Sequence, residues 1–115
     1  MSLDVYGIPN CDTVKKARTW LDQRGHAYTF HDYKKKGADA GKLAQWSDRV
    51  GWEALLNRRG TTFRGLSEAE KADIDRDKAL RLMARYPSLI RRPVVEHAGG
   101  VLVGFDAAAW EGALR

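Results

Sequence analysis

The sequence contains a single cysteine, Cys11, among its 115 residues. One cysteine excludes a disulfide within the chain and a zinc site built from several cysteines. Long apolar runs are also missing, because none approaches the roughly 20 residues that a helix needs to cross a bilayer. Residues 1–4 lack the basic and long apolar regions of a signal peptide. We therefore expect a cytoplasmic protein that binds no membrane, in which any disulfide formed by Cys11 involves a second molecule.

Strong charge patterning is absent as well. The net charge is +5, but the basic residues are spread along the chain apart from three short clusters, Lys34–Lys36, Arg58–Arg59 and Arg91–Arg92. They form no basic helical stripe and no known nucleic-acid motif, so we expect no direct contact with nucleic acid. The lysine cluster is expected in a solvated loop before Gly37. The histidines match no metal-binding spacing, and no metal is expected.

The composition, with 43% hydrophobic and 30% charged residues, is that of a folded domain. Hydrophobic periodicity predicts a βαβ unit, a mostly helical middle and a ββα unit, which together form one mixed sheet flanked by helices. The expected strands are 3–6, 27–31, 93–97 and 101–103. The first expected helix has its cap at Asp12 or Thr13 and ends before Gly25. Further helices are expected at 39–50, 52–56 and 74–86, and a last one from a cap at Asp106 to Leu114. A loop is expected at 57–64 and a capping box at Ser67.

Cys11 lies between the end of a predicted strand and the start of a predicted helix, at or just before the predicted N-cap. Unpaired backbone N–H groups and the positive end of the helix dipole stabilise a thiolate there, and lower the thiol pKa from its usual value of about 8.5. Lys15 adds positive charge, and Thr13 can donate a hydrogen bond to the thiolate or cap the helix. Asn10 and Asp12 are expected to shape the loop and cap the helix. A reactive thiol is therefore favoured over the alternative, a small buried hydrophobe.

Four segments, in this order along the chain, closely resemble the YffB-like branch of the arsenate reductase (ArsC) family. They are residues 6–17 (YGIPNCDTVKKA), 55–64 (LLNRRGTTFR), 89–94 (LIRRPV) and 103–105 (VGF). Each alone is a weak signal, but together they are specific, and the similarity covers nearly the whole chain.

The resemblance implies a thioredoxin-like α/β fold over residues 1–115, a single domain whose four-stranded mixed sheet is flanked by helices and interrupted by a helical insertion at about 38–86. It implies that Cys11 is the nucleophile, that Arg92 binds an oxyanion beside the sulfur, and that a cis bond precedes Pro93. A guanidinium suits this role because it stays charged and offers a fork of donors.

The resemblance also implies a thiol-disulfide reductase that uses glutathione as co-substrate. Cys11 attacks a mixed disulfide between glutathione and a small molecule or protein, and a second glutathione releases the enzyme. The expected enzyme is a monomer. Arg92 is expected to hold a glutathione carboxylate with help from Arg58 or Lys15. The remaining candidates for the binding site are Asn10, Asp12, Thr13, Arg64 and Pro93.

Arsenate reduction is a first alternative. Members of the family that reduce arsenate have three arginines around the cysteine, and only Arg92 matches here. The other two positions hold Asn57 and Gly104, which speaks against arsenate unless Arg58 or Arg64 compensates.

A second alternative is a non-catalytic regulator. The family includes Spx-like proteins, which bind RNA polymerase and carry a Cys-x-x-Cys redox switch. The second cysteine position is Val14 here, so the switch is excluded, whereas a constitutive adaptor is not.

Overall fold

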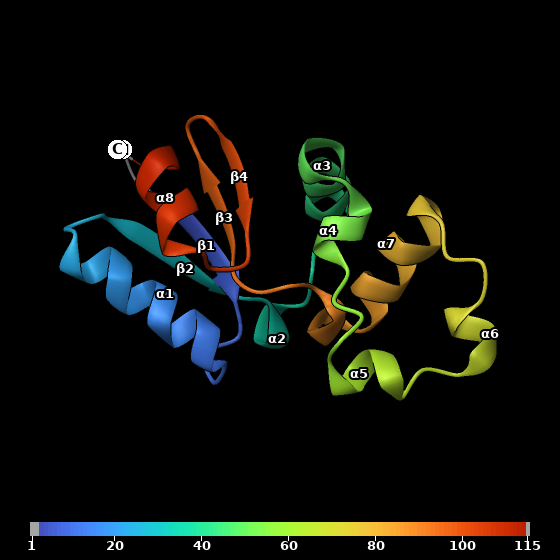
Figure 1. Ribbon diagram of the computed structural model, residues 1–115. Coiled ribbons are helices and arrows are strands. Elements are labelled where there is room, and N and C mark those ends of the chain that lie inside the picture. Colours follow the sequence, from blue (N-terminus) through green and yellow to red (C-terminus); the bar gives the residue numbers. More distant parts are fainter. Residues whose placement is uncertain (1–2, 115) are drawn as a thin grey trace. The chain divides into compact units, whose positions relative to one another are not determined.

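The computed structural model describes residues 3–114, which form a four-stranded sheet and a set of mostly short helices (Figure 1). The chain forms two compact units. The sheet unit holds the residues up to Lys35 and from Arg92 onward, and the helical unit is Lys36–Arg91. No helix within the described residues is both long and apolar enough to cross a membrane.

The sheet unit contains the predicted βαβ and ββα halves. Its strands lie in the order β2-β1-β3-β4, with β1 parallel to β2 and antiparallel pairing between β1 and β3 and between β3 and β4. The predicted mixed sheet is therefore confirmed. The elements are β1 (Leu3–Gly7), α1 (Asp12–Gln23), β2 (Tyr28–Asp32), α2 (Tyr33–Lys36), β3 (Val94–His97), β4 (Gly100–Val103) and α8 (Ala107–Ala113).

The register of these strands brings three connections to one edge of the sheet. Gly7, the last residue of β1, pairs with Asp32, the last residue of β2. Tyr6 also pairs with Val94, the first residue of the antiparallel strand β3. The loop after β1, the turn after β2 and the segment before β3 therefore start from neighbouring points.

The core of the sheet unit lies on one face of the sheet, under α1 and α8 (Figure 1). Alternation along β1 and β3 points their apolar side chains toward these helices. Trp110 of α8 meets Trp20 of α1 edge-on at 5.8 Å and Phe105 at 4.9 Å between ring centroids. The buried members of this cluster are Leu3, Val5, Ala17, Trp20, Leu21, Val95, Trp110 and Leu114.

The helical unit is built from α3 (Ala40–Val50), α4 (Trp52–Leu55), α5 (Thr61–Arg64), α6 (Glu68–Lys71), α7 (Arg76–Arg85) and the 3-10 turn η1 (Pro87–Leu89). Leu43 and Trp46 of α3 are buried, as are Leu82 and Met83 of α7. The capping box predicted at Ser67 is present, with its hydroxyl accepting from the backbone N–H of residue 70.

Two predicted boundaries in the helical unit are wrong, each for a different reason. The predicted loop at 57–64 contains α5, a single turn too short for hydrophobic periodicity to reveal. The helix predicted from Ile74 starts at Arg76, because the Asp75 side chain accepts from the Lys78 backbone N–H at 2.9 Å and fixes the N-cap there.

The lysine cluster is a helical turn, α2, and not a loop. Asp32 Oδ1 accepts hydrogen bonds from the backbone N–H groups of Lys34 at 3.1 Å and Lys35 at 3.3 Å. This interaction starts the turn directly at the end of β2. The lysine side chains are exposed, as expected.

Candidate active site

Cys11 is itself the N-cap residue of α1, with extended backbone angles of φ −84° and ψ 127°. Its carbonyl accepts from the Lys15 N–H at 2.9 Å, which begins the helix, and its own N–H donates to the Ile8 carbonyl at 3.2 Å. The loop is tight because Gly7 has no side chain. A Cβ atom at Gly7 would lie 3.0 Å from a methyl carbon of Val14. Close packing of β1 against the first turn of α1 therefore fixes the position of the sulfur.

The first turn of α1 directs donors at this sulfur. Because Cys11 is the N-cap residue, the backbone N–H groups of Thr13 and Val14 in the first turn favour a negative charge on its sulfur. Burial raises the pKa of the Cys11 thiol, but hydrogen bonds from Val14, Arg92 and Thr13, together with the charge of Arg92, outweigh burial and lower the pKa overall. The site favours the thiolate, which is the nucleophilic form.

Arg92 reaches the sulfur from the segment before β3. The Arg92–Pro93 peptide bond is cis, as the resemblance implied, and Pro93 is buried. Burial lowers the pKa of the Arg92 guanidinium, but its hydrogen bond to Cys11 and the proximity of Tyr33 raise it overall. The guanidinium therefore stays charged beside the sulfur.

Tyr33 is a third member of the site, and sequence reasoning missed it. Its side chain is 3% exposed, and its hydroxyl is hydrogen bonded to Arg92. Burial raises the pKa of the Tyr33 phenol far above its usual value, so the phenol is neutral at physiological pH. A signal did exist in the sequence. Tyr33 follows a strand expected to run parallel to the one before Cys11, and the carboxyl ends of parallel strands share one edge.

The other predicted residues near Cys11 have peripheral positions. The side chains of Asn10, Asp12, Thr13 and Lys15 are exposed. Thr13 contributes its backbone N–H to the sulfur, whereas the sequence pointed to its side chain. Asp12 is the first helical residue, so neither Asp12 nor Thr13 is the N-cap as predicted.

Arg58 and Arg64 belong to the helical unit. The Arg58 guanidinium lies 5.6 Å from the centre of the Trp52 ring. Arg64 Nη2 donates to the Arg59 carbonyl at 2.9 Å. Both side chains therefore have contacts within their own unit, and their contribution to a binding site remains a prediction.

Asn57 and Gly104 occupy the two positions at which family members that reduce arsenate have arginine, and both form hydrogen bonds that involve the local backbone. Asn57 Oδ1 accepts from the Arg59 N–H at 3.1 Å and shapes the turn after α4. Gly104 adopts a positive φ of 75°, which disfavours a long side chain. Its N–H donates to the Pro93 carbonyl at 2.8 Å, and its carbonyl accepts from Trp110 Nε1 at 3.1 Å.

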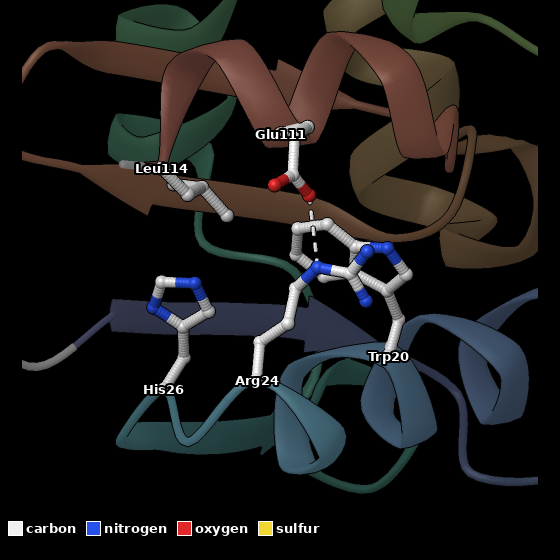
Figure 2. A pocket seen from close by; sticks show the side chains of 5 residues that line it. All are labelled: Trp20, Arg24, His26, Glu111 and Leu114. Atoms are coloured by element: carbon white, nitrogen blue, oxygen red, sulfur yellow. Dashed lines mark hydrogen bonds and ion pairs between the residues drawn. The ribbon is translucent and has the colours of Figure 1, made fainter.

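A separate cavity of about 250 Å³ lies at the carboxyl end of α1, away from Cys11 (Figure 2). Arg24 lies across the Trp20 ring at 4.1 Å and pairs with Glu111 at 2.8 Å, and the side chains of His26 and Leu114 complete the wall. None of the predicted site residues lines this cavity. Within residues 3–114, no cluster of three or more His, Cys, Asp or Glu side chains could hold a metal ion.

Comparisons with known proteins agree with this architecture. A solved structure of a protein called YffB is 54% identical, with a TM-score of 0.95 over 98% of this chain and 99% of its own. An arsenate reductase (ArsC) related protein from Brucella melitensis is 50% identical, with a TM-score of 0.78 over 100% of this chain and 96% of its own. The global transcriptional regulator Spx 1 of Lactococcus lactis is 25% identical, over 90% of this chain and 82% of its own.

The family model of the ArsC family matches residues 6–113, which include both halves of the sheet, the helical unit and the segments around Cys11 and Arg92. The resemblance found in the sequence is thereby confirmed. This chain belongs to the ArsC family and has its thioredoxin-like fold.

Proposed function

We propose that the protein is a monomeric thiol-disulfide reductase in which Cys11 is the nucleophile and glutathione the electron donor. The observation that carries this proposal is the position of Cys11 at the N-cap of α1, where the backbone N–H groups of Val14 and Thr13 and the side chain of Arg92 favour the thiolate. A structural cysteine needs none of these donors. The neighbours related to arsenate reductases support thiol redox chemistry, and a cytoplasm rich in reduced glutathione is the setting it requires.

The reaction balances with one cysteine. The Cys11 thiolate attacks the glutathione sulfur of a mixed disulfide, the old S–S bond breaks, and the substrate thiolate leaves and takes a proton from solvent. The thiolate of a second glutathione then attacks the glutathione sulfur bound to Cys11. This step forms oxidised glutathione and restores the Cys11 thiolate. Two glutathione sulfurs are joined, and one substrate thiol is released.

In this proposal Arg92 has two tasks. Its charge holds Cys11 ionised before the reaction, and its guanidinium would bind a glutathione carboxylate when the substrate arrives. Lys15, exposed one turn after Cys11, would add attraction for the anionic tripeptide. Arg58, Arg64 and Pro93 complete the proposed binding set, with Asn10, Asp12 and Thr13 around the sulfur. This assigns residues 1–115 to one working domain, with the helical unit as an insertion into the sheet unit.

The test measures turnover of a mixed disulfide between glutathione and a small thiol. Glutathione reductase serves as the coupling enzyme that reports the oxidised glutathione formed. We expect activity in the wild type, none in Cys11→Ser, and a glutathione adduct at Cys11 by intact mass. Lys15→Ala should raise KM, whereas the neighbouring variant Lys16→Ala, also exposed, serves as the matched control and should not. Activity that survives Cys11→Ser would overturn the proposal.

The same protein preparations distinguish the proposed reductase from the two alternatives, an arsenate reductase and a non-catalytic adaptor. Arsenate-dependent oxidation of glutathione with no mixed-disulfide activity would identify an arsenate reductase. A stable complex with RNA polymerase that survives Cys11→Ser, in a protein without turnover, would identify an adaptor. The similarity to a protein named as a global transcriptional regulator makes this last arm necessary.

A further inference from the structure

We infer that Tyr33 is the positioning residue of this site: its buried hydroxyl accepts a hydrogen bond from Arg92 and holds the guanidinium against the Cys11 sulfur. The inference rests on the proposed role of Cys11 as the nucleophile. It adds a residue that neither the sequence motifs nor the family resemblance singled out.

Strand geometry brings the two side chains together. Tyr33 directly follows Asp32, which pairs with Gly7 at the end of β1. Arg92 directly precedes Pro93 and β3, whose first residue Val94 pairs with Tyr6. Both residues therefore leave the sheet at the edge where the loop to Cys11 begins.

The backbone of Tyr33 is itself held in place. The Asp32 side chain caps the following turn by accepting from the N–H groups of Lys34 and Lys35. The ring is 3% exposed, so its hydroxyl has little freedom to move. A flexible arginine loses rotamer freedom when it is held in one conformation, and a fixed acceptor on a second element lowers the cost of holding it near the sulfur.

The chemistry of the acceptor matters as much as its position. A carboxylate at this place would pair with Arg92 and cancel its charge, which would weaken the attraction for the Cys11 thiolate and for an anionic substrate. A phenol kept neutral by burial orients the guanidinium through a hydrogen bond and leaves its charge in place. Tyrosine therefore combines fixed geometry with an undiminished positive charge.

The test is the pH dependence of Cys11 alkylation in the variant Tyr33→Phe, which keeps the ring and removes the hydroxyl. Because a charged hydrogen bond contributes more than a neutral one, we expect the alkylation rate at pH below the midpoint to fall by about three- to tenfold as the midpoint moves upward. In the Arg92→Leu background the same substitution should have no further effect, since the two residues act through one contact.

Tyr28→Phe is the matched control. Tyr28 also accepts a hydrogen bond from an arginine, Arg18 Nε at 3.1 Å, but it belongs to the core cluster of the sheet unit. Its removal should leave the alkylation midpoint of Cys11 unchanged. Thermal unfolding checks that each variant is folded, and Tyr33→Leu provides a second variant without the hydroxyl.

An unchanged midpoint in folded Tyr33→Phe or Tyr33→Leu would overturn the inference, and so would an equal shift in the Arg92→Leu background. Alkylation requires neither glutathione nor a disulfide substrate. A midpoint that moves in a protein without reductase turnover would therefore contradict the proposed function and leave the role of Tyr33 intact. Turnover combined with an alkylation midpoint that does not change in the Tyr33 variants would support the proposed function and contradict the role of Tyr33.

Discussion

The two helices that cover the sheet, α1 and α8, pack on the same face but begin with different chemistry. At the start of α8, Asp106 Oδ1 accepts from the N–H groups of Ala108 at 3.0 Å and Ala109 at 3.3 Å. At the start of α1 a sulfur, that of Cys11, stands in the same position. The Asp106 carboxylate caps α8 through these two hydrogen bonds, whereas the first turn of α1 favours a negative charge on the sulfur of Cys11. One helix start provides stability, and the other holds a thiolate ready to react.

The largest effect is expected when the N-cap residue of α1 is replaced by aspartate, the N-cap residue of α8. In Cys11→Asp we expect turnover to fall by about three orders of magnitude or more, because the nucleophile is gone. At a pH low enough for the Cys11 thiol to be protonated but not the new carboxylate, the free energy of unfolding should rise by about 1 kcal/mol, since a carboxylate is a far better cap than a neutral thiol. Turnover assays and urea denaturation measure the two effects. A loss of stability would show that Cys11 already caps α1 fully.

The reverse exchange places a cysteine at the start of α8. In Asp106→Cys, made in the Cys11→Ser background, we expect a loss of about 1 kcal/mol in the free energy of unfolding as the two capping bonds disappear. The new thiol replaces a side chain that accepts from Ala108 and Ala109 at the helix start, whereas Cys11 also has Arg92 to lower its pKa, so the alkylation midpoint of the new thiol should be higher than that of Cys11 in the wild type. Equal midpoints would mean that the helix start alone activates the thiol and that Arg92 adds nothing.

The sequence alone predicted most of this contrast. Alternating and helical spacing of apolar residues, together with turn and capping residues, identified the four strands and α1, α3, α7 and α8. Asp106 was recognised as a cap because aspartate is a common capping residue. Cys11 was expected at or just before the N-cap, because Asp12 and Thr13, which follow it, are common capping residues by type. In the structure Cys11 is the N-cap. The close approach of Gly7 to Val14 in this loop depends on how β1 packs against α1, and local preferences do not encode that contact.

Tyr33 could not be found by the same reasoning. A tyrosine followed by three lysines has the pattern of a strand end running into a polar loop, and nothing in its neighbours points to catalysis. Its role arises only when the parallel pairing of β1 with β2 and the antiparallel pairing of β1 with β3 bring three connections to one edge. Local propensity has no access to such long-range register.

The ionisation of Cys11 should also make the stability of the protein depend on pH. The folded state lowers the Cys11 pKa, so the unfolded chain binds more protons between the folded value and the unfolded value of about 8.5. The stability of the wild type relative to Cys11→Ser should therefore rise with pH across this window. It should be constant above the window, where both states are ionised, and this contribution is lost as the pH falls through the folded pKa. Denaturant titrations at a series of pH values measure it, and a difference that falls as pH rises would contradict the stabilised thiolate.

The smallest effect is expected at the opposite end of α1, where Arg24 and Glu111 form an ion pair over Trp20 (Figure 2). The two side chains are 42% and 53% exposed, so Glu111→Gln should cost no more than about 0.2–1 kcal/mol, and less at high salt. Reactivity should not change, because about 18 Å of helix separates this pair from Cys11 at 1.5 Å per residue. Urea denaturation at two salt concentrations and the alkylation midpoint test both statements. A shifted midpoint would mean that the two ends of α1 are coupled, and that the thiolate depends on more than the first turn, Arg92 and Tyr33.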